Sequence, residues 1–211
     1  KKTIVEYLKK FPNIDAVKYF VMDMNHVYLG ICKELFPNAK PVADRFHYTR
    51  CCTEAVEAVR KRVQDSLSSK ARKRFKKSRK LLLKKYGKLS PEERVAVEAL
   101  LAHSEDLTRA WLLKEDFYRF LQSKDSDEAK KKLDQFCHSA KKLQLPEFEP
   151  LLKTLKNWEP YILNSFDCPY SNGFTEGTNN SIKVLKRVTY GMPNFRNFRA
   201  RILHCCSKVI P

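Results

Sequence analysis

The chain has 211 residues, 43% of them hydrophobic, and its 42 lysines and arginines against 24 aspartates and glutamates give a formal net charge of +18. The apolar share allows a packed interior and excludes a wholly disordered chain, and the basic excess favours a polyanionic partner, most often nucleic acid. No apolar run approaches the ~20 residues needed to cross a bilayer. Seven cysteines without a C-x-x-C spacing are typical of reduced thiols. We therefore expect a cytoplasmic protein with no membrane partner.

The first 50 residues predict a strand–helix–strand unit. AVKYFVMD at 16–23 and KPVAD at 40–44 are short apolar runs that each end in an aspartate, and HVYLGICKELF at 26–36 has helical spacing between them. Two strands joined by a helix are expected to be parallel, and ligands of α/β sheets bind at the carboxyl ends of such strands. Asp23 and Asp44 stand at those ends.

From about residue 47 to residue 166 the pattern is helical almost throughout. We expect one long helix from His47 towards Tyr86, with Gly87 as its stop. A second helix is expected to begin at Ser90, where a capping serine is followed by a proline and two glutamates. Some 120 helical residues therefore interrupt the domain to which the strand unit belongs.

The stretch SNGFTEGTNN at 171–180 leads into a helix expected to end near residue 190, and a last helix is expected from about residue 194. Glu176 lies near the N-terminus of the first of these helices, where the helix dipole favours its charge. Lys183 and Arg187 fall on the same face of this helix as the glutamate.

Three carboxylates are candidate metal ligands: Asp23, Asp44 and Glu176. Carboxylates that converge on one edge of a sheet repel one another unless a cation lies between them, and Mg²⁺ or Mn²⁺ prefer oxygen ligands. Two such ions stabilise the attacking and leaving oxygens of a phosphoryl displacement. The alternative is that each aspartate only caps the helix that follows it.

Two long stretches closely resemble bacterial insertion-sequence transposases of the ISL-three type: VMDMNHVYLGICKELFPNAKPVADRFHYTR at 21–50 and SNGFTEGTNNSIKVLKRVTYGMPNFRNFRARIL at 171–203. The most specific parts are D-R-F-H at 44–47 and N-G-F-T-E-G-T-N-N at 172–180. The resemblance implies an α/β, predominantly helical fold. It would comprise a truncated RNase H-like catalytic core of two parallel strands and a large all-α insertion. In residue numbers, the core is 1–50 and 167–211, and the insertion is 51–166.

The resemblance also implies a D-D-E triad that holds two divalent metal ions, Mg²⁺ or Mn²⁺. Asp23 matches the second aspartate and Glu176 the glutamate, whereas Asp44 and His47 match a D-x-x-H motif with a supporting role. Asn180, one turn after Glu176, is assigned a supporting role too. The first aspartate would precede the chain, so we interpret the chain as a fragment of a longer transposase that is inactive alone. The alternative is a complete triad of Asp23, Asp44 and Glu176.

The parent protein would cut phosphodiester bonds at the ends of a mobile element and join the freed 3′-hydroxyl to target DNA. Its partner would be double-stranded DNA. The parent would be homo-oligomeric in the synaptic complex. It would act in the bacterial cytoplasm, at the nucleoid. Two alternatives stay open. One is an RNase H-like nuclease or resolvase, and the other is a non-enzymatic DNA-binding protein derived from a transposase.

The segment KARKRFKKSRKLLLKK at 70–85 carries ten basic residues in sixteen. A solvated helix is the plain alternative, but within the insertion of a DNA-processing enzyme these cations are expected to displace counterions from phosphates. No reading of specific bases is indicated. The candidate DNA-binding residues are Lys73, Arg74, Lys76, Lys77, Lys183, Arg187, Arg196 and Arg199.

Overall fold

The computed structural model describes residues 2–206, apart from the side chains of Arg74 and Cys206. The chain forms two compact units, Lys1–Pro169 and Tyr170–Pro211. Between residues 2 and 206, no helix is long and apolar enough to cross a membrane.

The first unit opens with the strand–helix–strand arrangement that the sequence predicts. Helix α1 (Lys2–Leu8) and the 3-10 turn η1 (Ile14–Ala16) precede β1 (Tyr19–Met22), α2 (His26–Leu35) and β2 (Lys40–Ala43). The strands are parallel, with Val21 opposite Val42. A small apolar core that includes Val5, Ile31 and Leu35 holds α1 and α2 together. The predicted fold class, helical α/β with two parallel strands, is confirmed.

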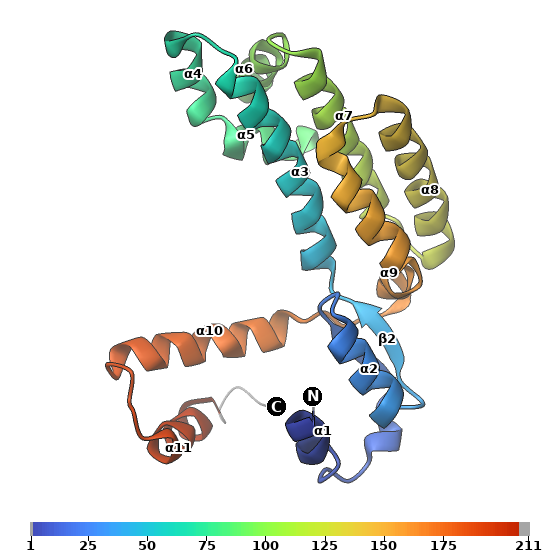
Figure 1. Cartoon of the computed structure of the whole chain (residues 1–211), viewed down its shortest axis with the longest axis vertical. Helices are drawn as coiled ribbons and strands as arrows, with labels where there is room; N and C mark the ends of the chain where they lie inside the picture. Colours follow the sequence, from blue (N-terminus) through green and yellow to red (C-terminus); the bar gives the residue numbers. More distant parts are fainter. Residues whose placement is uncertain (1, 207–211) are drawn as a thin grey trace. The chain divides into compact units, whose positions relative to one another are not determined.

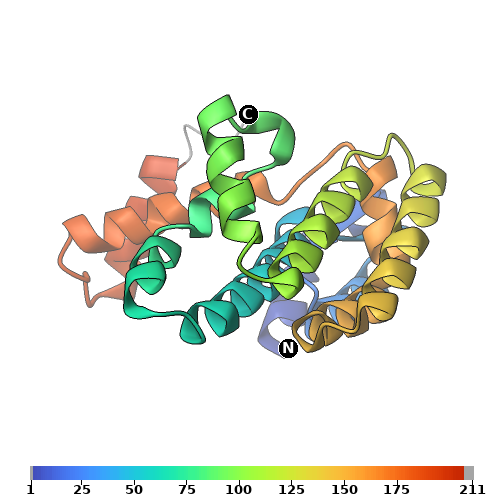
Figure 2. The same cartoon turned by 90° about the horizontal axis from the view of Figure 1, so that it is seen from above.

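Four helices form a bundle at the carboxyl end of β2: α3 (Arg45–Asp65), α7 (Glu105–Phe120), α8 (Ser126–Leu143) and α9 (Glu149–Asp167), the last preceded by η3 (Pro146–Phe148). Each helix turns an apolar stripe inward, and Val59, Phe117, Phe136 and Ile162 are almost fully buried at the centre. Helices α8 and α9 lie side by side in both views (Figures 1 and 2). Because α9 runs back along α3 to β2, the bundle begins and ends beside the strand pair.

The prediction of a single long helix from His47 to Tyr86 is wrong. The chain instead forms α3, α4 (Ser69–Lys76), α5 (Arg79–Leu83) and η2 (Tyr86–Lys88). At the first break the Ser66 hydroxyl donates to the Val63 carbonyl (2.8 Å), and at the second the Ser78 hydroxyl donates to the Phe75 carbonyl (2.7 Å). Such local bonds compete with helix continuation.

Two buried cations hold the broken segment in place. The Arg60 guanidinium, on α3, donates to the Phe75 carbonyl at the end of α4 (3.0 Å). The ammonium of Lys114, a fully buried residue of α7, donates to the carbonyls of Leu82 (2.8 Å) and Lys84 (2.9 Å). It also pairs with Glu115 at 2.7 Å, and burial lowers the pKa of Lys114. Removal of the Lys114 ammonium would take this donor from both carbonyls, whereas the Phe75 carbonyl would still accept from the Ser78 hydroxyl without Arg60.

Helix α6 (Pro91–Leu101) begins where the sequence predicts. The Ser90 hydroxyl accepts from the Glu93 amide (3.2 Å), and the Glu93 carboxylate accepts from the Ser90 amide (2.8 Å), which makes a complete capping box.

The second unit contains α10 (Gly173–Val188) and α11 (Phe195–Cys206), as expected. The chain turns between them through Tyr190, Gly191 and Met192, all at positive φ, and the Gly191 amide donates to the Lys186 carbonyl (2.9 Å). No side chain of α10 is buried within the unit.

Candidate metal centre

The carboxyl ends of the two strands bring Asp23 and Asp44 together. Met22 and Ala43 form the last pair of the parallel register, so the two aspartates follow at the same edge. The Asp44 amide donates to the Met22 carbonyl (2.9 Å), which ties the start of α3 to the end of β1. The placement predicted for these two side chains is therefore observed.

His47 lies between the two carboxylates. It follows Asp44 by three residues on the first turn of α3, a spacing that puts both side chains on one face of the helix. Its Nε2 is 2.7 Å from Asp23 Oδ1 and 3.8 Å from Asp44 Oδ2. One ligand atom from each of the three residues lies within 4.8 Å of the other two. The Nε2 atom either donates a proton to Asp23 or presents its lone pair to a cation.

The two oxygens of Asp44 have different surroundings. Oδ1 caps α3 by accepting from the Phe46 amide at 3.5 Å, a long bond. Oδ2 is buried and accepts no hydrogen bond. A buried carboxylate oxygen without a donor is costly, and a divalent cation would satisfy it. The capping role and the metal role expected for Asp44 are thus compatible, and the two carboxylates offer the oxygen ligands that Mg²⁺ or Mn²⁺ prefer.

The returning helix α9 fixes the start of α3 behind this cluster. The Arg45 guanidinium donates to the Ser165 carbonyl (2.7 Å), and Asn164 donates to the Pro41 carbonyl (2.8 Å). Because the Ser165 hydroxyl donates to the Ile162 carbonyl, it accepts from the Tyr48 hydroxyl at 2.9 Å. Burial raises the pKa of Tyr48 to about 12. These contacts hold the backbone that carries Asp44 and His47.

Arg45 and Ser165 were not predicted from the sequence as positioning residues. Arg45 is the second residue of D-R-F-H, so the motif offered a signal. Ser165 offered none, because its role depends on where α9 returns. Helix α9 also contacts the start of α2, just after Asp23: the centroids of the His26 and Trp158 rings are 4.8 Å apart.

The remaining predicted catalytic residues belong to the second unit. Glu176 lies on the first turn of α10 and is partly exposed. Asn180, one turn further on, is exposed and lines an apolar pocket with Phe174 and Val184. Because these residues and the Asp23 cluster belong to different units, the approach of Glu176 to Asp23 stays a prediction.

The predicted DNA-binding cations are exposed wherever their side chains are described. Lys73, Lys76 and Lys77 lie on α4 or directly after it, and the side chain of Arg74 is outside the described part of the chain. The exposed cations of the second unit are Lys183 and Arg187 on α10 and Arg196 and Arg199 on α11.

A parallel strand pair with acidic carboxyl ends, joined to a helical bundle, defines an α/β protein with a candidate metal-binding edge. Residues 1–202 match a protein family described as "Transposase", that of the DDE transposases of the ISL3 type. The chain therefore belongs to this transposase family.

Curated relatives agree with this assignment. The transposase for insertion sequence element IS1557 of Mycobacterium tuberculosis is 30% identical over 194 residues, which cover 82% of this chain and 43% of that protein. The transposase for insertion sequence element IS1001 of Bordetella parapertussis is 26% identical over 189 residues, or 88% of this chain and 47% of that protein. A Lactococcus lactis protein named "ATP-dependent protease" is 35% identical over 108 residues, or 51% of this chain and 33% of that protein. The chain thus spans less than half the length of the two transposases. No solved structure matches it significantly.

Proposed function

We propose that this chain is part of a DNA transposase that cuts phosphodiester bonds at the ends of a mobile element and joins the freed 3′-hydroxyl to target DNA. The supporting observation is the cluster of Asp23, Asp44 and His47 at the carboxyl edge of a parallel strand pair, in a chain of the transposase family. Ligands of α/β sheets bind at this edge. The family and both named transposases favour this function over a nuclease, a resolvase or a non-enzymatic DNA-binding protein.

In this proposal Asp23 and Glu176 hold the divalent metal ions, Mg²⁺ or Mn²⁺. When bound, such ions stabilise negative charge on the attacking and leaving oxygens of the phosphodiester. Asp44 supports the site with its unpartnered Oδ2, and His47 orients Asp23 through the 2.7 Å contact. Asn180 would support Glu176 from the next turn of α10.

The proposed division into a core of 1–50 and 167–211 and an insertion of 51–166 is supported by the path of the chain. Helix α3 leaves the strand pair at Arg45, and α9 returns to it at Asp167. There the Asp167 carboxylate lies 3.6 Å from the Lys40 ammonium at the start of β2. The helical segment therefore leaves from and returns to the same small sheet.

A strand-transfer assay tests the proposed chemistry, with the protein encoded by the complete reading frame around this sequence. Asp23→Asn and Glu176→Gln are expected to lower the rate by more than about 100-fold, since even a change behind a metal ligand costs about 10- to 100-fold. The matched control is Asp15→Asn, which removes an exposed carboxylate of η1 and should leave the rate unchanged. Full activity of either site variant would refute the assigned roles.

The same assay on the 211-residue chain alone separates the two possible triads. If Asp23 and Glu176 are two of three required carboxylates, the chain joins no DNA ends even with Mn²⁺ present. If Asp23, Asp44 and Glu176 form a complete triad, it joins them, and Asp44→Asn abolishes the joining.

DNA is the proposed partner, and the exposed cations of α4 support it. Replacement of Lys73, Arg74, Lys76 and Lys77 by alanine is expected to weaken DNA binding. It should also flatten the dependence of log K on log salt by up to about four, at ~0.9 per lost phosphate contact. An unchanged slope would show that this segment does not touch the backbone. Synapsis of two element ends further implies a homo-oligomeric parent.

The name of the Lactococcus lactis relative does not lead to a second proposal. The match covers only a third of that protein. The five glycines of this chain also do not form the G-x-x-x-x-G-K-[ST] loop that cradles nucleotide phosphates in many ATPases.

A further inference from the structure

The helices α4 and α5 lie in the most one-sided stretch of charge in the chain. Between Asp65 and Glu92 there are 26 residues, of which eleven are lysine or arginine and none is acidic. Among the described residues, the exposed lysines at 70, 73, 76, 77 and 80 have no ion-pair partner.

Some cations elsewhere in the first unit lie beside carboxylates. Arg62 pairs with Asp106 (2.9 Å) and Glu147 (2.6 Å), and Lys130 pairs with Asp134 (2.7 Å) and Glu159 (2.9 Å). What sets α4 and α5 apart is the local excess of charge, eleven cations with no carboxylate in residues 66–91. So concentrated a positive charge favours a polyanionic ligand.

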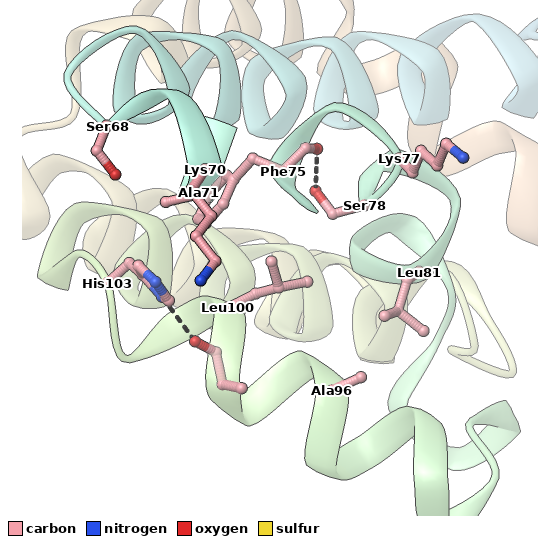
Figure 3. A pocket seen from close by; sticks show the side chains of 11 residues that line it. Ser68, Lys70, Ala71, Phe75, Lys77, Ser78, Leu81, Ala96, Leu100 and His103 are labelled. Atoms are coloured by element: carbon pink, nitrogen blue, oxygen red, sulfur yellow. Dashed lines mark hydrogen bonds between the residues drawn. The ribbon is translucent and has the colours of Figure 1, made fainter. Parts of the chain in front are cut away.

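A pocket of about 540 Å³ opens beside these lysines, between α4–α5 and α6. Its walls are apolar, with Ala71 and Leu81 on one side and Ala96 and Leu100 on the other (Figure 3). The small alanine side chains leave the space between the helices open. The volume lies within the range of about 300–1,000 Å³ that is usual for small-molecule sites.

The polar side chains of the lining are two serines, two lysines and His103, and the buried Ser78 hydroxyl is already bonded to the Phe75 carbonyl (2.7 Å). The Lys70 ammonium extends over it towards His103, whereas Lys77 lies at the edge of the lining with its ammonium turned outward (Figure 3). His103 Nδ1 is 2.7 Å from the Ala99 carbonyl. Because a carbonyl only accepts, Nδ1 carries the proton, and Nε2 is left to bond a ligand. The lining contains no carboxylate.

We propose that this pocket binds one unpaired nucleotide of a DNA strand, with the base between the apolar walls and the adjoining phosphates on Lys70 and Lys77. The proposal rests on the DNA-directed function proposed above. An apolar slot with a cationic rim suits a base and its phosphates, whereas phosphate contacts alone would need no pocket. A paired base cannot leave the stack without an energetic cost, so the pocket should prefer DNA that offers an unpaired base.

Fluorescence anisotropy with the 211-residue chain tests this, using a labelled short duplex and the same duplex with one unpaired nucleotide. The wild type is expected to bind the second probe about tenfold more tightly, the order of one base contact. Ala96→Leu fills the pocket without loss of charge and should abolish this preference while duplex affinity stays the same. Ala71→Leu, on the opposite wall, is a second filling variant if the first does not fold.

Two controls isolate the pocket. Val95→Leu changes an exposed residue of α6 outside the pocket and should leave the preference at about tenfold. The double variant Lys73→Ala with Lys76→Ala should lower the affinity for both probes by the same factor. It should also reduce the slope of log K against log salt by about two.

The outcomes distinguish the two proposals. If the wild type binds neither probe, the DNA-directed function itself is contradicted. If it binds both probes equally, or if the filling variants keep the preference, DNA contacts only the lysines and the nucleotide pocket is refuted.

Discussion

Tyr48→Phe tests the contact between α3 and α9 that holds the candidate metal centre. Tyr48 is fully buried, and its hydroxyl donates to Ser165 Oγ at 2.9 Å. The substitution leaves the ring in place, and Ser165 keeps its own bond to the Ile162 carbonyl (2.7 Å). The cost at neutral pH is therefore that of one hydrogen bond, about 1 kcal/mol of unfolding free energy.

The same substitution should stabilise the protein in alkali. Burial raises the pKa of Tyr48 to about 12, whereas an unfolded tyrosine titrates near 10. Between these values the unfolded chain loses the phenol proton and the folded chain retains it, so the wild type becomes less stable as pH rises. The loss is about 1.4 kcal/mol at about pH 11 and tends to about 2.7 kcal/mol above pH 12, from ~1.36 kcal/mol per pKa unit. The phenylalanine side chain of the variant has no proton to lose.

Urea unfolding, followed by circular dichroism without added divalent ions, measures both effects. The variant should be less stable than the wild type at pH 7, and the two stability curves should cross close to pH 11, at about the pH where the two effects are equal. Tyr190→Phe removes a 99% exposed hydroxyl and should match the wild type throughout. Parallel curves for Tyr48→Phe and the wild type up to pH 11 would refute the raised pKa of the buried Tyr48 hydroxyl, and equal stability at pH 7 would refute the contribution of its hydrogen bond.

Two further predictions concern the helical segment. Lys114→Met removes the donor to two buried carbonyls and the partner of Glu115, and should lower the free energy of unfolding by about 3 kcal/mol. Lys131→Met, at an exposed position of α8, should cost less than about 0.5 kcal/mol, and equal effects in urea unfolding would contradict the buried role of Lys114. Ser90→Ala breaks the capping box of α6 and should cost about 1 kcal/mol, whereas Ser90→Thr keeps the capping hydroxyl and should retain most of the stability. A neutral Ser90→Ala would show that α6 does not depend on its cap.

The strand–helix–strand unit could be predicted because its signals are local. Apolar runs of four and three residues end just before Asp23 and Asp44, and the segment between them has the spacing of a connecting helix. The parallel register then follows from chain direction, and with it the meeting of the two aspartates. The position of His47 follows from its three-residue spacing from Asp44.

The break of the expected long helix could not be predicted from periodicity. Helical spacing continues through residues 45–83, and serine is an acceptable helix residue when its hydroxyl faces water. Here Ser66 and Ser78 bond their own backbone, and Arg60 draws the end of α4 back to α3. The hydroxyl bonds are local, but the contact of Arg60 with α4 is tertiary and has no sequence signature, and neither has the burial of Lys114.

The metal centre could be predicted only in part. Asp23, Asp44 and His47 belong to one short segment, so local geometry brings them together. Glu176 follows about 130 residues later and lies in a separate compact unit. Its partnership with Asp23 depends on long-range packing that no spacing in the sequence specifies.

Titration of the 211-residue chain with Mn²⁺, followed by the electron paramagnetic resonance of the free ion, tests the divalent metal site most directly. The wild type is expected to bind Mn²⁺, and Asp23→Asn and Asp44→Asn should each bind at least about tenfold more weakly. Asparagine is as good a helix cap as aspartate, so Asp44→Asn should keep the fold of α3. Asp15→Asn should bind as the wild type does. Equal binding by all four proteins, or no binding by the wild type, would contradict a metal centre at the ends of β1 and β2.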